Sequence, residues 1–134
     1  MSKLKALSIR QPFAEEILTG EKVIEYRSWS VGYRGPLLIH AGLSKAEEGH
    51  EGLPRGCLVG VVQLVDITHA GDRDYHWHLS NPARFVSPIP FKGAVGILPV
   101  PLELVQDVEL ILPDGTSAGE TLAAYLASTG EAVP

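Results

Sequence analysis

Cysteine is almost absent from this chain of 134 residues, which contains only Cys57. A single cysteine excludes a disulfide within the chain and is compatible with a reducing compartment. Long apolar runs are lacking as well, since nowhere do about 18 apolar residues follow one another, the length that a membrane-spanning helix needs. We therefore expect a cytoplasmic protein that is neither exported nor inserted in a membrane.

An excess of positive charge is also lacking. Eleven basic residues stand against sixteen acidic ones, so the net charge is −5 at pH 7. Tight nonspecific binding to nucleic acid depends on neutralising many phosphates, and this balance argues against it. The charge is unevenly distributed, however, because residues 1–55 hold eight of the basic residues against seven acidic ones. This distribution allows one local positive face.

What the chain does contain is a series of short strand patterns. The predicted strands cover residues 3–9, 23–29, 37–41, 57–67, 85–91 and 94–100. The other predicted segments are a short helix from Pro12 to Gly20, a mobile loop or single helical turn over 44–56, a loop over 68–82, an amphipathic or strand segment over 103–112 and a final helix over 117–127. Many short strands with few helices indicate an α+β fold, a small mixed β-barrel, in a single domain that spans residues 1–134.

A cluster of polar residues surrounds the first predicted helix. Strand alternation places Glu25 and Arg27 on one side of the strand that follows the helix. Gln11 at the helix entrance, Lys22 at the strand entrance and Trp29 can converge with them into a pocket. In the alternative interpretation Glu25 and Arg27 form a surface ion pair and Trp29 belongs to the core.

The segment over residues 68–82 contains His76 and His78 on either side of Trp77. Such spacing allows metal coordination, but no cysteine pair or helical histidine pair accompanies it. We favour a solvated loop with Trp77 tucked against the barrel, and expect neither a metal nor a cofactor. A third interpretation has Tyr75 or Trp77 stacking on a base.

Four stretches resemble one known family. They read SIRQPFAEEILTGEKVIEYRSW, GPLLIHA, GCLVGVVQLVDI and NPARFVSPIPFKGAVGI, and they extend from about residue 7 to about residue 98. The residues that match the family pattern are Gln11, Pro12, Gly20, Lys22, Glu25, Arg27, Trp29, His40, Ala41, Gly56, Gly60 and Gly93. The family is that of ASCH domains, which are related to the RNA-binding PUA domains. The resemblance implies a PUA-like pseudobarrel with a short helix at its mouth.

The same resemblance implies a binding module for single-stranded RNA or a modified nucleoside. Cationic side chains would meet phosphates or base acceptors, Gln11 and Glu25 would pair with base edges, and a tryptophan would stack. The expected ligand-binding residues are Arg10, Gln11, Lys22, Glu25, Arg27, Trp29, His40, Trp77 and Lys92. We expect a monomer.

Two other functions stay open. Some small ASCH relatives resemble nucleases or amidohydrolases of acylated cytidine, and the latter have a lysine followed three positions later by a threonine nucleophile. Lys22 matches that lysine, but Glu25 occupies the threonine position. An enzyme would therefore use Glu25 as a general base and Lys22 to stabilise an oxyanion, since Ser8, Thr19 and Ser28 show no accompanying base. The other function is protein interaction, since ASCH domains also occur fused to transcriptional coactivators.

Overall fold

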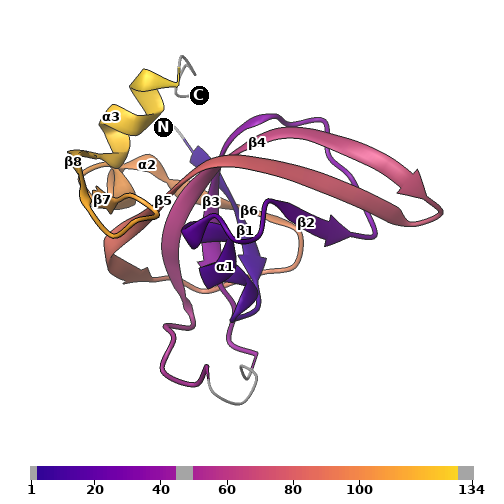
Figure 1. Ribbon diagram of the computed structural model, residues 1–134, viewed down its shortest axis with the longest axis horizontal. Coiled ribbons are helices and arrows are strands. Elements are labelled where there is room, and N and C mark those ends of the chain that lie inside the picture. Colours follow the sequence, from indigo (N-terminus) through magenta and orange to yellow (C-terminus); the bar gives the residue numbers. More distant parts are fainter. Residues whose placement is uncertain (1–2, 45–49, 130–134) are drawn as a thin grey trace.

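The computed structural model describes residues 3–44 and 50–129, and this part of the chain forms eight strands and three short helices (Figure 1). The strands are β1 (Lys3–Ile9), β2 (Ile24–Arg27), β3 (Gly35–Ala41), β4 (Cys57–Gly71), β5 (Asp74–Pro90), β6 (Ile97–Pro101), β7 (Glu109–Ile111) and β8 (Ser117–Thr121). The helices are α1 (Phe13–Thr19), α2 (Leu102–Val105) and α3 (Leu122–Ser128). None of these helices has the length and apolar character needed to cross a membrane.

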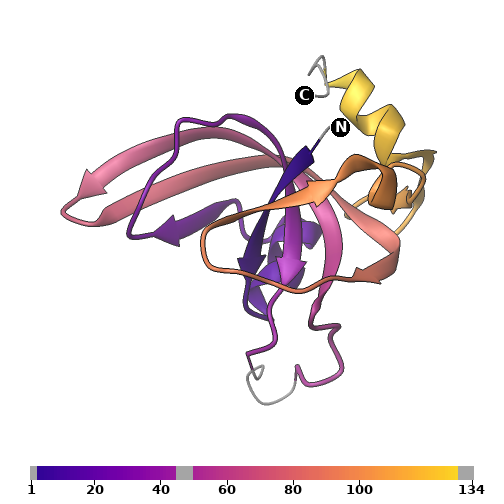
Figure 2. The same ribbon diagram turned by 180° about the vertical axis from the view of Figure 1, so that it is seen from behind.

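The strands make one mixed sheet in the order β6-β1-β3-β4-β5-β7-β8, and β2 also pairs with β5. β1 runs parallel to β3, whereas the other neighbouring strands are antiparallel. Register shifts within the β3–β4 and β4–β5 pairs bend the sheet, as bulges do. Figure 2 shows β6 beside β1 at the end of the sheet. The predicted α+β fold is confirmed, as a curved sheet whose described path runs open from β6 to β8.

The segment over residues 68–82 is not the predicted loop. β4 and β5 continue through it as a long hairpin that projects from the body of the protein (Figure 1). His69 pairs with Tyr75 and Thr68 with His76, and Arg73 at the turn adopts a positive φ of 52°. The prediction was wrong because Asp72 and Arg73 form only the tight turn at the tip of the hairpin, whereas strand pairing continues on both sides of that turn.

Three further boundaries differ from the prediction. β6 begins at Ile97 rather than Ala94 and pairs with β1, not with the preceding strand. The segment over residues 103–112 divides between α2 and β7. The predicted final helix begins as β8, because Glu109 pairs with Thr121, and becomes helical only after Thr121 caps α3.

Other local features agree with the sequence. Gly20 ends α1 in the left-handed region with φ 86°, and α1 begins at Phe13, one residue after the predicted start at Pro12. β3 is buried along its entire length, as its apolar sequence predicts. Of the final helix, Leu122, Tyr125 and Leu126 face inward and are buried.

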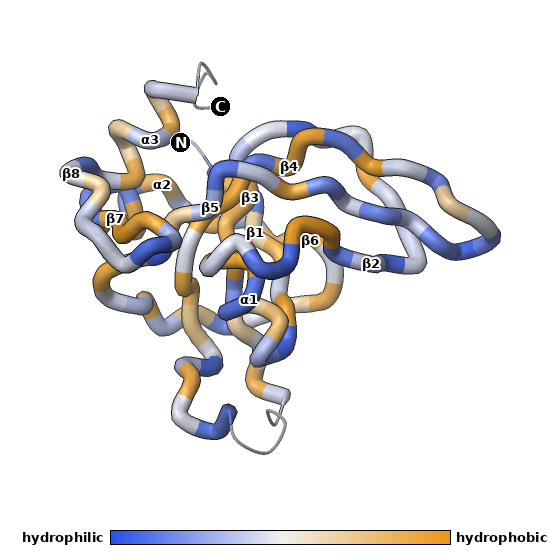
Figure 3. Tube along the Cα trace, in the orientation of Figure 1, coloured by the Kyte–Doolittle hydropathy of each residue, from blue (hydrophilic) through white to orange (hydrophobic). Residues whose placement is uncertain are grey.

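The core consists of two clusters of buried side chains. One cluster contains the buried residues of α1, with Leu37, Ile39 and Trp77. The other contains those of α3, with Leu38 and Phe85. Neighbouring residues of β3 enter different clusters because strand side chains alternate, so both faces of the sheet are covered. Figure 3 shows hydrophobic residues along the central strands and a largely hydrophilic tip of the β4–β5 hairpin.

Gly60 marks the closest approach of α1 to the sheet. A Cβ atom there would lie 2.5 Å from the Ala83 carbonyl oxygen and 2.5 Å from Cδ2 of Leu18. We predict that Gly60→Ala lowers the free energy of unfolding by about 1–3 kcal/mol, the usual cost of overpacking. Urea denaturation measures the loss. Gly32→Ala is the matched control, since nothing lies within 4 Å of its added atom, and equal losses in both variants would contradict the prediction.

Tyr125 joins α3 to the bulged part of β5. Its hydroxyl donates to the Asn81 carbonyl oxygen at 2.8 Å and accepts from Nε2 of Gln63 at 3.3 Å. Burial raises the pKa of Tyr125 to about 12. The folded protein therefore holds this proton more tightly than the unfolded chain, whose tyrosine pKa is about 10. The stabilisation that comes from this difference in pKa is fully present below the unfolded pKa of about 10 and is lost as the pH rises through the folded pKa.

Absorbance titration of tyrosinate tests this assignment. Of the four tyrosines, we predict that one ionises with a midpoint near the pKa of about 12 given for Tyr125. This phase disappears in Tyr125→Phe and persists in Tyr26→Phe, because Tyr26 is exposed. Retention of the late phase in Tyr125→Phe would refute the assignment.

Candidate functional site

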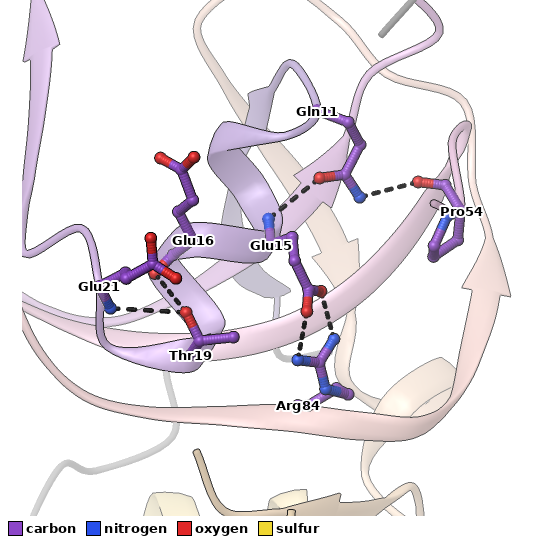
Figure 4. Close-up of polar contacts among 7 residues, drawn as sticks. All are labelled: Gln11, Glu15, Glu16, Thr19, Glu21, Pro54 and Arg84. Atoms are coloured by element: carbon purple, nitrogen blue, oxygen red, sulfur yellow. Dashed lines mark hydrogen bonds and ion pairs between the residues drawn. The ribbon is translucent and has the colours of Figure 1, made fainter. Parts of the chain in front are cut away.

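The entrance to α1 is fixed by the side chain of Gln11, which is only 1% exposed. Its Oε1 accepts a hydrogen bond from the Glu15 backbone N–H at 3.0 Å, and its Nε2 donates to the Pro54 carbonyl oxygen at 2.9 Å (Figure 4). Gln11 therefore satisfies an orphan amide of the first helical turn and holds the segment before β4 against it. The oxygen and the nitrogen of its side-chain amide each bond to the protein backbone, so the structure does not support the expected pairing of Gln11 with a base edge.

A second contact holds α1 to β5. The Arg84 guanidinium donates two hydrogen bonds to the Glu15 carboxylate, and the bond from Nη2 to Oε2 is 2.8 Å long (Figure 4). The hydrogen bond to Glu15 raises the pKa of Arg84. In the sequence Glu15 is an acidic residue of the first helical turn, and no local signal connects it to Arg84, 69 residues further along the chain.

β2 places Glu25 between two cations. The carboxylate Oε2 accepts from Nε of Arg27 at 2.9 Å, and Oε1 lies 3.5 Å from Nζ of Lys22. All three side chains are largely buried, with exposed fractions of 10% for Glu25, 17% for Lys22 and 23% for Arg27. The shared face predicted for Glu25 and Arg27 is present. One carboxylate serves two cations, so the cluster carries one net positive charge.

Arg27 connects this cluster to β1. Its Nη2 donates to the Ser8 carbonyl oxygen at 2.9 Å. The Ser8 hydroxyl in turn lies 3.0 Å from Nδ1 of His40, and Nε2 of His40 lies 2.6 Å from the Phe91 carbonyl oxygen. These contacts form one continuous polar path from Lys22 to the segment before β6.

The path ends at a hollow of about 360 Å³. Its lining residues are Ser8, His40, Gly42, Leu43, Ser44, Lys92, Gly93, Ala94 and Val95. The volume is at the lower end of the range for small-ligand sites, roughly 300–1,000 Å³. We call this space the Ser8 hollow. Lys92, an expected ligand-binding residue, is exposed at its edge.

A second hollow of about 370 Å³ lies beside Lys22 on the side of α1. Phe13 and Tyr26 contribute its aromatic surfaces, and Nζ of Lys22 lies 4.8 Å from the centre of the Tyr26 ring. The guanidinium of Arg10 lies 5.6 Å from the Phe13 ring. Glu16 and Glu21 also line this hollow, so it is less suited to phosphate than the Ser8 hollow.

The two tryptophans belong to the core, which agrees with the interpretations of Trp77 tucked against the barrel and of Trp29 as a core residue and not with their listing as ligand-binding residues. Trp77 has 0% of its surface exposed, and its Nε1 donates to the Trp29 carbonyl oxygen at 3.2 Å. The rings meet edge to face with centroids 4.9 Å apart. Trp77 is therefore a core residue that offers no face to a base, and the partly buried Trp29 packs against it. Tyr26, 58% exposed, is the better stacking surface.

The histidines on the hairpin interact with neighbouring side chains. Nε2 of His78 lies 2.6 Å from the Thr68 hydroxyl, and Nε2 of His76 lies 3.2 Å from Oδ1 of Asp74. Within the described parts of the chain, no three histidine, cysteine or carboxylate side chains gather in a manner suited to a metal ion.

The chain is similar to known proteins in both sequence and structure. The model of the ASCH domain family matches residues 7–89. The chain belongs to the ASCH domain family. The resemblance inferred from the sequence is confirmed.

Two relatives of the domain are activating signal cointegrator 1 from Homo sapiens and from Mus musculus, each 29% identical over 119 residues. Each match covers 65% of this chain and 20% of the relative. The chain thus spans about a fifth of the length of these relatives. The crystal structure of ASCH from Zymomonas mobilis has a TM-score of 0.55 and 14% identity, and the match covers 75% of this chain and 90% of that one. This likeness shows a common fold.

The role of Gln11 in this ASCH domain gives a prediction. Gln11→Ala leaves the Glu15 amide and the Pro54 carbonyl without their partner, and we expect a loss of about 1–3 kcal/mol in the free energy of unfolding. Urea denaturation measures it beside Gln106→Ala, a control whose glutamine is only partly buried. If Gln11→Ala were as stable as the unmodified protein, the hydrogen bonds of Gln11 to the first turn of α1 and to Pro54 would not stabilise the fold, and the prediction would be wrong.

Proposed function

We propose that this ASCH domain binds a short single-stranded RNA segment or a modified nucleoside at the Ser8 hollow. The observation that carries the proposal is the sharing of Glu25 between Lys22 and Arg27, which leaves a fixed positive charge connected to the hollow through Ser8. A fixed cation loses little side-chain entropy when a phosphate binds. The exposed ammonium of Lys92 adds a second cation at the hollow's edge.

The proposed site offers only a few cations for the recognition of phosphate. Arg10, Arg27 and Lys92 are the candidates for phosphate contacts, and the rest of an acidic chain repels an extended polyanion. The proposal therefore specifies a short ligand. The aromatic faces of Phe13 and Tyr26 line the second hollow, so stacking on them requires a ligand that extends from the Ser8 hollow to the second one.

A hydrolase that uses Lys22 and Glu25 receives less support. A general base needs a carboxylate oxygen directed at water or substrate, whereas both oxygens of Glu25 contact cations of the protein. The interaction function is supported only by the likeness to activating signal cointegrator 1, of which the chain covers 20%.

Lys92→Ala tests the proposal. We expect binding of a short single-stranded RNA to weaken roughly threefold to tenfold at low salt, because one phosphate contact is lost. The slope of log affinity against log salt concentration should fall by about 1. Fluorescence anisotropy with labelled oligonucleotides of different sequence measures both quantities, and modified nucleosides added in excess serve as competitors.

Lys3→Ala is the matched control for charge. Lys3 is exposed and lies at the end of β1 opposite Ser8. The substitution Lys3→Ala removes the same single positive charge as Lys92→Ala, but at a residue that is not among those lining the hollow. Equal effects of the two substitutions, or no binding by the unmodified domain, would refute the proposal.

A further inference from the structure

The Ser8 hollow contains a serine and a histidine in direct contact. Ser8 on β1 and His40 on β3 are register partners in the parallel pair. Their side chains therefore emerge side by side, and the Ser8 hydroxyl lies 3.0 Å from Nδ1 of His40. The sequence showed no base for Ser8, because residues 32 positions apart reveal their register only in the folded sheet.

The other ring nitrogen fixes the proton arrangement. Nε2 of His40 lies 2.6 Å from the Phe91 carbonyl oxygen. A carbonyl only accepts, so Nε2 carries the proton. In the neutral ring Nδ1 is then an acceptor, and the Ser8 hydroxyl donates to it. A nucleophile, a base and a group that orients the base are thus aligned, which is the arrangement that activates a serine.

Two glycines leave space around the Ser8 hydroxyl. A Cβ atom on Gly42 would lie 3.2 Å from Oγ, and one on Gly93 would lie 3.4 Å from Oγ and 2.7 Å from Cε1 of His40. Both glycines line the hollow. The absence of side chains at these positions keeps the hydroxyl open to a ligand and lets the chain close over the imidazole.

The remaining lining defines a ligand. Leu43 is 76% exposed and Val95 is 101% exposed, so the rim is apolar, whereas the floor is polar. Lys92 supplies a cation that can stabilise an oxyanion. We propose that Ser8 is a nucleophile, with His40 as its general base, that cleaves esters of small carboxylic acids. This activity goes beyond RNA or nucleoside binding and does not require it.

The proposed reaction has two steps. The Ser8 Oγ attacks the ester carbonyl carbon while its proton passes to Nδ1 of His40. The carbon–oxygen bond to the alcohol then breaks, and the alcohol leaves with that proton. A water molecule, deprotonated at the same nitrogen, attacks the acyl-serine and releases the carboxylic acid and free Ser8. The Phe91 carbonyl accepts from Nε2 throughout.

A fluorophosphonate probe tests the nucleophile. The Ser8 oxygen forms a bond to phosphorus, fluoride leaves, and the serine proton is taken up by His40. We expect one adduct by intact mass, located on Ser8 by peptide mapping, and absent in Ser8→Ala. Ser28→Ala is the matched control, because Ser28 is exposed and is not among the residues that line the hollow. No adduct on Ser8 of the folded protein would overturn the proposal.

The base has its own test. His40→Gln should slow labelling by about 100-fold or more, the usual contribution of a general base. Gly93→Ala, which displaces the imidazole without removing it, should also slow labelling. Circular dichroism establishes that each variant is folded. If His40→Gln does not fold, Gly93→Ala decides, and undiminished labelling of the folded variant would overturn the role of His40.

Turnover and RNA binding are measured separately. Release of p-nitrophenol from p-nitrophenyl acetate should be lost in Ser8→Ala, and the anisotropy of labelled RNA is measured on the unmodified domain. Ester cleavage without RNA binding would refute the proposed binding function alone. RNA binding with no Ser8 adduct and no cleavage would refute the serine chemistry alone.

Discussion

The pairing of β5 is the constraint on which the rest of this domain depends. β5 runs for 17 residues and pairs with β4 along one edge. Its other edge accepts β2 near the hairpin tip and β7 near its opposite end. If the segment over residues 68–82 were a loop, β2 would have no hydrogen-bonding partner. Glu25 and Arg27 would then not be held over β1, and the polar path to Ser8 would not exist.

The buried charge of Glu25 explains why that path is so extensively connected. A carboxylate removed from water is costly unless cations and hydrogen bonds replace the lost solvent. Lys22 and Arg27 provide this replacement, and Arg27 also donates to the Ser8 carbonyl oxygen. The interaction therefore fixes the direction of two long cationic side chains. Fixed cations of this kind are suited to binding an anion, because their ordering occurs during folding and not during binding.

Sequence reasoning was accurate where the deciding interaction was local. The left-handed Gly20, the buried β3 and the shared face of Glu25 and Arg27 all follow from neighbouring residues and strand periodicity. It left alternatives open where register decides the outcome. The sequence allows Trp77 to pack against the barrel or to stack on a base, and pairing of β5 with both β2 and β4 directs its ring into the core.

In the candidate site, too, features set by neighbouring residues could be predicted, whereas contacts between residues far apart in the sequence could not. Gln11 was correctly placed at the helix entrance, yet its bond to the distant Pro54 carbonyl removes it from the ligand. Ser8 was dismissed because no base stood near it in sequence, whereas the parallel pairing of β1 with β3 supplies His40. Gly93 contributes to the site because it has no side chain, which leaves room for His40. This role cannot be predicted from the sequence, because it depends on which residues lie next to Gly93 in the fold.

The acidic composition and the polar hollow together restrict what this domain can recognise. Charges farther apart than about 8 Å are largely screened at physiological salt. The net negative charge of the chain gives no long-range attraction to a polyanion. Association then depends on short-range fit, and the selective elements are the apolar rim of Leu43 and Val95 and the oriented groups of the floor. A ligand with one anionic or carbonyl group and a small apolar body satisfies both, whereas a long nucleic acid satisfies only the cations.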